Sequence, residues 1–203
     1  MSYSEFKLNG VFQAFGLTLN EKSGLFAGIP EESPSDLLST ILLENVDLAV
    51  AINSEKARSE MIISPVLLEV RRKFNNEISL FSGVDFTVDI ERGLNGFCDF
   101  LLSLSKEQLF VRAPVITLVE TKNENLKSGF AQCIAEMVAA QLFNEQQGNS
   151  IKTIYGCITI GTIWQFLKLE ERLVSIDLSE YYIRDIKNIL GIFSYAIREN
   201  QNQ

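Results

Sequence analysis

Apolar residues change their spacing along the chain, and the spacing predicts the order of helices and strands. Residues 36–52, after a capping Ser35 or Asp36, and residues 55–74 have helical spacing. Pro65 inside the second range predicts a kink or a late first turn. Alternating or continuous apolar runs predict strands, and helical spacing returns twice afterwards. The predicted strands are 86–90, 96–103, 115–122, 153–161 and 164–169, and the later helices are 126–146 and 179–197.

This order of helices and strands predicts an α/β fold with one mixed central sheet and helices on both faces. The sequence contains no linker and no low-complexity segment, so residues 1–203 are expected to form a single domain. Residues 1–50 precede the main pattern and are expected to pack on the core as an N-terminal extension. A lid, a dimerisation arm and a target-recognition element are all compatible with that segment.

Composition excludes several classes of active site. The chain has no histidine, which excludes Ser-His-Asp triads, HExxH zinc sites and Cys₂His₂ fingers. With 18 basic and 26 acidic residues, its net charge is −8, which argues against a broad basic surface for nucleic acid. Cys98, Cys133 and Cys157 are far apart and are expected to be small buried apolar residues. The absence of a signal-peptide pattern and of a long apolar run predicts a cytoplasmic protein without membrane contact.

Two predicted strands carry acidic residues where a plain core would not. Asp99 lies within an apolar strand, and Glu120 and Lys122 end the next one, two residues apart on the same face. Neighbouring strands can place Asp99 beside Glu120, and a buried carboxylate pair requires neutralisation. Mg²⁺, or Mn²⁺ as a substitute, would provide it, with the Thr121 carbonyl oxygen and waters as further ligands. Lys122 would orient or help deprotonate a water on that ion.

The sequence here resembles a known family. Asp99 followed 21 positions later by Glu120-Thr121-Lys122 resembles the PD-(D/E)XK, or restriction-endonuclease-like, nuclease superfamily. That resemblance covers roughly residues 55–165 and implies a core of helix, three-stranded meander, helix and further strand. Cys98 stands where the name-giving proline would be.

The resemblance also implies two supporting residues. Members often carry a glutamate on the helix before the meander, for which Glu60 is the preferred candidate and Glu69 and Glu55 are alternatives. Several branches place a glutamine on the following helix near the metal or the scissile phosphate, and Gln132 matches that position.

The expected function is therefore Mg²⁺-dependent hydrolysis of nucleic-acid phosphodiester bonds by an endonuclease, with DNA as the expected substrate. The alternative is a catalytically silent member of the fold that acts in protein interaction or assembly. The net charge favours the alternative, unless a homodimer or a basic partner concentrates positive charge at the site. Structural interpretations also exist for each residue: a solvated ion pair for Glu120 and Lys122, an edge-strand acid for Asp99, and surface positions for Glu60 and Gln132.

Overall fold

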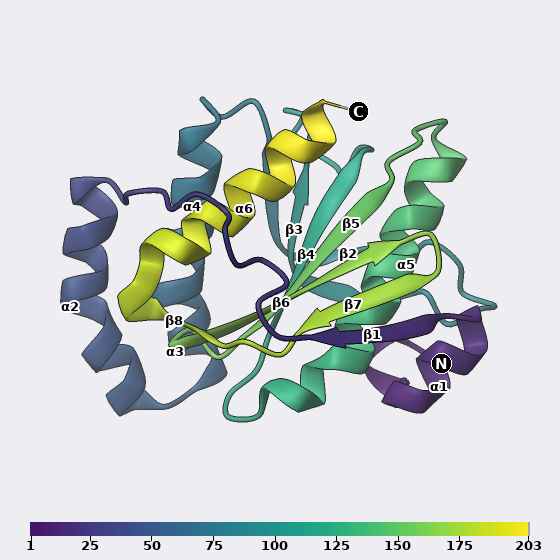
Figure 1. The fold of residues 1–203 in the computed structure, drawn as a ribbon, viewed down its shortest axis with the longest axis horizontal. Helices are drawn as coiled ribbons and strands as arrows, with labels where there is room; N and C mark the ends of the chain where they lie inside the picture. Colours follow the sequence, from purple (N-terminus) through teal and green to yellow (C-terminus); the bar gives the residue numbers. More distant parts are fainter. Residues whose placement is uncertain (203) are drawn as a thin grey trace.

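Strand β4 (Val115–Thr121) has all seven residues buried and lies inside the central sheet (Figure 1). Its continuous apolar run suits a strand that is covered on both faces. The computed structural model describes residues 1–202, in which eight strands form one open mixed sheet of order β1-β7-β6-β5-β4-β3-β2, with β8 paired to β6. The other strands are β1 (Thr18–Lys22), β2 (Ser79–Asp85), β3 (Phe97–Ser103), β5 (Thr153–Thr159), β6 (Ile163–Glu170), β7 (Leu173–Asp177) and β8 (Tyr181–Tyr182).

Helices cover both faces of the sheet, so the predicted α/β layering is confirmed (Figure 1). Two apolar cores result, one under α1 and α5 and the other under α2, α4 and α6. The helices are α1 (Leu8–Phe15), α2 (Asp36–Ile52), α3 (Glu55–Arg58), α4 (Ser64–Lys73), α5 (Phe130–Gln146) and α6 (Ile186–Gln201). Within residues 1–202, no helix combines the length and apolar character needed to cross a membrane.

The segment that was predicted as one helix over 55–74 contains a change of helical type. A π-helical turn, Ser59–Ile63, separates α3 from α4. Pro65 is the second residue of α4, near a helix start, where a missing backbone N–H costs little. The late first turn predicted from Pro65 is thus present.

The first predicted strand, 86–90, is wrong. That segment forms no regular strand: it has a few backbone hydrogen bonds to residues 94–96 and one isolated bridge from Asp89 to Leu94, and the strand lies earlier, at β2. Gly83 inside β2 has φ +60°, a conformation that interrupts a regular strand and conceals its pattern. The strands predicted at 96–103, 115–122, 153–161 and 164–169 are confirmed as β3, β4, β5 and β6.

The ends of the chain contribute more to the sheet than the sequence predicted. Residues 1–50 supply α1, most of α2 and strand β1, which pairs in parallel with β7 at one edge of the sheet. Neither β1 nor β7 was predicted. The closing helix begins at Ile186 rather than at 179, because Tyr181–Tyr182 first pairs with β6. The three cysteines are free and buried, as expected.

Replacing Gly191 of α6 with alanine should destabilise the fold, because an added Cβ would overlap the backbone oxygen of Pro30. Backbone cannot move aside as a flexible side chain can, so we expect a loss of roughly 1–3 kcal/mol. Gly10→Ala is the matched control, since its Cβ would meet nothing within 4 Å and the helix should gain about 0.5–1 kcal/mol. Urea denaturation measures both changes, and equal effects would contradict the packing argument.

Candidate active site

Asp99 and Glu120 lie on neighbouring strands and face α5. The register that pairs Phe100 with Val119 places Asp99 opposite Glu120 in the β3–β4 ladder. The backbone N–H and the hydroxyl of Thr121 both donate to Asp99 Oδ2, at 2.8 and 2.7 Å. The Asp99 carboxylate is therefore held at the end of β4, next to the second acid.

The Lys122 ammonium and the Gln132 amide complete a hydrogen-bonded group around Glu120. Lys122 Nζ donates to Glu120 Oε1, and Gln132 Nε2 donates to Glu120 Oε2 at 2.9 Å. Lys122 Nζ also lies 3.5 Å from Gln132 Oε1. Glu120 is only 1% exposed, so these contacts replace water around a buried carboxyl group. Of the residues predicted for the site, the structure brings together Asp99, Glu120, Thr121, Lys122 and Gln132.

A glycine allows α5 to begin close to these strand ends. A Cβ at Gly129 would lie 2.9 Å from Ile158 Cγ2 and 3.3 Å from Lys122 Cε. Only a residue without a side chain leaves the neighbouring strands undisturbed at this separation. The small residue therefore sets the distance between Gln132 and the acids.

Glu136 is a site residue that the sequence interpretation missed. It lies one turn after Gln132 on α5 and is 0% exposed, and its Oε1 accepts a hydrogen bond from Gln132 Nε2 at 3.1 Å. Its Oε2 is buried without a partner. The available signal was an acid inside the apolar and alanine-rich stretch 133–140, at the i+4 spacing from Gln132 that places two side chains on one helix face.

Burial and neighbouring charge shift the proton affinities of this group. Burial and the negative charge of Asp99 raise the pKa of the Glu120 carboxyl to about 8, although Lys122 opposes the shift. Burial, followed by the charge of Glu120, raises the pKa of Glu136 well above its ordinary value. Burial acts to lower the pKa of Lys122, yet the surrounding carboxylates raise it, with Glu120 the strongest. The lysine therefore keeps its proton and is the cation of the group.

The three glutamates considered for the helix before the meander lie in different environments. Glu60, the preferred candidate, points away: its side chain is 62% exposed and forms an ion pair with Lys56 at 3.5 Å. Glu69 is buried, but it accepts hydrogen bonds from Ser35 and Arg72 and so anchors the start of α2. Glu55 is the glutamate of this region whose charge acts on both Glu120 and Lys122.

The oxygen atoms of this group are of the type that binds a hard divalent cation. The side chains are not arranged around a common metal position. Within residues 1–202, no group of three or more histidine, cysteine, aspartate and glutamate side chains is arranged to hold a metal ion. Asp99 and Glu120 offer carboxylate oxygens, and Thr121 adds a backbone carbonyl oxygen. The unpartnered oxygen of Glu136 and the excess of acids over Lys122 are consistent with a further cation.

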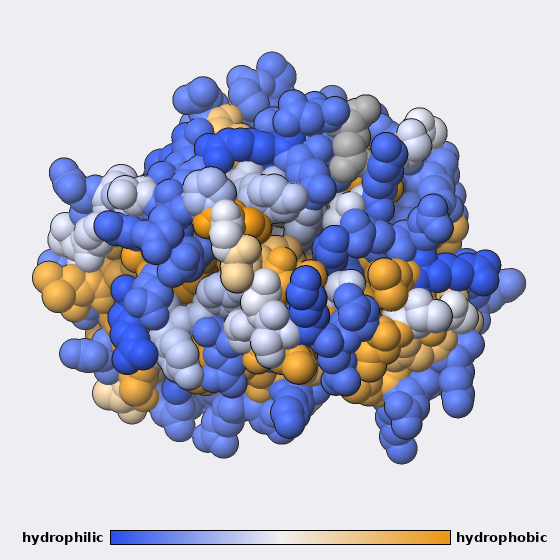
Figure 2. All heavy atoms as spheres, viewed as in Figure 1, coloured by the Kyte–Doolittle hydropathy of each residue, from blue (hydrophilic) through white to orange (hydrophobic). Residues whose placement is uncertain are grey.

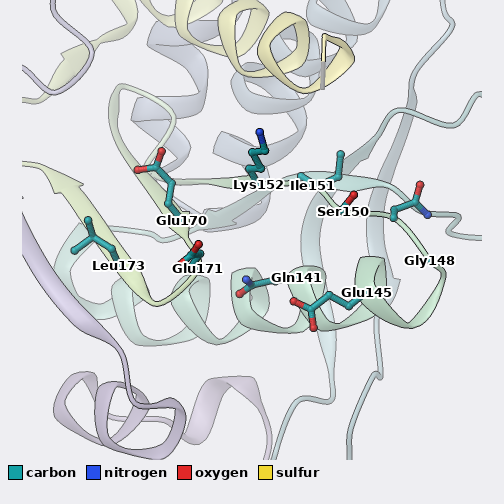
Figure 3. Close-up of a pocket in the computed structure, with 10 residues that line it drawn as sticks. Gln141, Glu145, Gly148, Ser150, Ile151, Lys152, Glu170, Glu171 and Leu173 are labelled. Carbon is teal, nitrogen blue, oxygen red and sulfur yellow. The ribbon is translucent and has the colours of Figure 1, made fainter.

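A cavity of about 700 Å³, drawn in Figure 3, has no residue of this group in its lining. It is formed by the C-terminal end of α5 and the turn between β6 and β7, whereas the acids lie at the start of α5. Glu145, Glu170, Glu171 and Lys152 line it. Since none of the predicted site residues reaches it, the cavity gives no support to the predicted chemistry.

The free energy of unfolding should fall as the pH rises from about 5 to about 8. Glu120 and Glu136 keep protons in the folded chain that the unfolded chain releases near pH 4.5, so the folded state binds more protons in this window. The Glu120 shift alone corresponds to a loss on the order of 4 kcal/mol. The raised pKa of Lys122 changes the free energy of unfolding only near or above pH 10.5. The lowered pKa values of Glu32 and Glu69 change it only below about pH 4.5. Urea titrations across this range measure the slope.

Glu136→Gln tests the origin of that slope. The amide keeps the shape of the side chain but cannot ionise, so the variant should lose less stability between pH 5 and pH 8 and should be more stable than wild type at pH 8. Glu145→Gln, an exposed position on the same helix, is the control and should leave the slope unchanged. An identical slope in wild type and Glu136→Gln would show that Glu136 is not protonated by burial.

The Gln132 amide links the Lys122 ammonium with the carboxyl groups of Glu120 and Glu136, while Thr121 holds the Asp99 carboxylate beside them. Such a group can bind a cation and can hold or move a proton. Comparison of the chain with protein-family models finds no match, and comparison with curated protein sequences finds no relative.

Proposed function

We propose that the chain is a divalent-metal-dependent phosphodiesterase of the restriction-endonuclease-like type, with DNA as its substrate. The observation that carries the proposal is the meeting of Asp99, Glu120 and Lys122 at the ends of two adjacent strands, next to Gln132 of α5. Two acids and a lysine are the groups that phosphodiester hydrolysis with a metal ion requires, and the chain has no histidine to serve instead.

The order of elements around the site supports the proposal. A helix, α4, precedes the antiparallel strands β2, β3 and β4, which are followed by α5 and by β5, parallel to β4. This is the order that the resemblance implies for the nuclease core. The remaining strands β6, β7 and β1 extend the sheet beyond it.

In this proposal each residue of the group has a separate task. Asp99 and Glu120, with the Thr121 carbonyl, would hold Mg²⁺ or Mn²⁺, and Thr121 keeps Asp99 in place. The ion would supply charge neutralisation and a more acidic water. Lys122 presents a proton and a positive charge where negative charge develops on the phosphate, and Gln132 fixes the lysine and Glu120 relative to each other.

A catalytically silent protein that acts through protein contacts is the second candidate, and the charge distribution favours it. The run Arg71-Arg72-Lys73, the densest basic segment, is engaged locally rather than offered to a phosphate backbone. Arg72 pairs with Glu69, and Lys73 pairs with Glu32. An acidic protein of this kind would bind DNA weakly without a basic partner.

Titration with Mn²⁺ by calorimetry, followed by cleavage assays on plasmid and single-stranded DNA at low salt, tests the proposal. Wild type should bind Mn²⁺ and Asp99→Ala should not, since the variant lacks one of two carboxylate ligands. Lys122→Met should retain Mn²⁺ binding while cleavage falls by about 10²–10³-fold, which is typical when a charge-stabilising group is removed. Glu60→Gln, an exposed acid outside the group, is the control and should behave as wild type.

Two results would overturn this assignment. Equal Mn²⁺ binding by wild type and Asp99→Ala would remove the metal site. Metal binding without cleavage of any DNA or RNA substrate would favour the silent protein.

A further inference from the structure

An open groove lies on the same face and at the same end of the sheet as the acidic group. It has a volume of about 670 Å³, within the range of ligand sites. Strands β6, β7 and β1 form its floor, and the first residues of α1 and α5 form its walls. Eight of its fourteen lining residues are apolar, among them Leu8, Leu19, Leu126, Phe130, Ile163 and Ile176. A Cβ at Gly129 would lie 3.4 Å from Glu120 Cγ, and the next residue, Phe130, lines the groove, so the start of α5 lies between the acidic group and the groove.

One margin of the groove is an unpaired strand edge. β1 is the last strand in the order of the sheet, and no strand of residues 1–202 pairs with its outer side. Leu19 and Glu21 of β1 both line the groove, while Leu19 is 46% exposed. Apolar side chains gather over β1 and α1 at the lower right of Figure 2. An unpaired edge with an apolar flank is a ready template for a further strand.

The charged residues at the groove determine which strand fits. The lining of the groove includes three glutamates and one lysine: Glu21, Glu124, Glu180 and Lys127. These glutamates form no ion pair with any residue in the described part of the chain. A second copy of this chain would bring a second set of the same three groove glutamates and would double a net charge of −8, so self-pairing is disfavoured. Nucleic acid is disfavoured for the same reason.

We propose that this groove docks an extended basic segment of a partner protein, which pairs with the outer edge of β1 and places aliphatic side chains between α1 and α5. Backbone hydrogen bonds to β1 would provide the pairing, and alternate side chains would enter the groove. Lysine or arginine side chains in the segment meet Glu21, Glu124 and Glu180. The docking site does not depend on phosphodiester cleavage.

Fluorescence anisotropy tests the proposal with a labelled eight-residue peptide in which lysine and valine alternate along one face of the extended chain and serine occupies the other face. Wild type should bind this peptide at least about tenfold more tightly than a glutamate–valine peptide of the same length. Glu21→Lys should weaken binding by about tenfold. Glu44→Lys makes the same charge change on an exposed position of α2, away from the groove, and should weaken binding less than about twofold. Asp99→Ala should bind as wild type does, which separates this test from that of the proposed function.

A lysine–valine peptide with N-methyl groups along one edge tests the strand pairing itself. It keeps the charge and the side chains but cannot donate along that edge, so its affinity should fall by about tenfold. Three outcomes would overturn the proposal: equal losses in Glu21→Lys and Glu44→Lys, equal binding of the methylated and parent peptides, or tighter binding of a labelled 12-nucleotide single-stranded DNA. A dimer in sedimentation that dissociates in Leu19→Asp would assign the groove to a second copy instead.

Discussion

The contact between the Lys122 ammonium and the Glu120 carboxyl group is the interaction on which the candidate site depends. Glu120 is almost fully buried, and a charge in that position is costly unless it is paired and hydrogen-bonded. Lys122 is the cation beside it, and Asp99 and Glu136 add further acidic groups close by. Three acids share one cation, and two of them are fully buried. Glu120 and Glu136 therefore stay protonated at pH values at which an exposed glutamate is ionised. An arrangement of this kind costs stability and is typical of a functional site.

The same hydrogen bonds tie the site to the fold. Thr121 joins β4 to Asp99 of β3, and Gln132 joins β4 to Glu136 of α5, so two strands and a helix meet through side chains at one end of the sheet. The unpartnered oxygen of Glu136 has no structural benefit, since an apolar residue would fill the same space without an unmet hydrogen bond. Its presence at the base of the site is therefore better explained by function than by packing.

The sequence predicted the centre of this structure better than its edges, for identifiable reasons. β4 was recognisable because burial on both faces produces a continuous apolar run, and that run ends at Glu120 and Lys122. β1 was missed because its five residues are all exposed, which leaves no alternation to detect. Glu60 was preferred over Glu69 and Glu55 because the sequence around it resembles the helix of the nuclease family. Its side chain is instead exposed, and the π-helical turn Ser59–Ile63 alters which side chains share a face.

The net charge of −8 affects the site and the groove in opposite ways. At the acidic group it repels a phosphate backbone, and Lys122 is already engaged by Glu120, so the group alone offers little positive charge to a nucleic acid. At the groove the same negative charge attracts a basic segment. Both features lie at one end of the sheet and on one face, with β7, β6 and β5 between β1 and β4, so a basic protein that paired with β1 and extended across the groove would bring positive charge towards Asp99 and Lys122. The acidic chain could then approach a polyanion through its basic partner. Its net negative charge would make nucleic-acid binding depend on that partner.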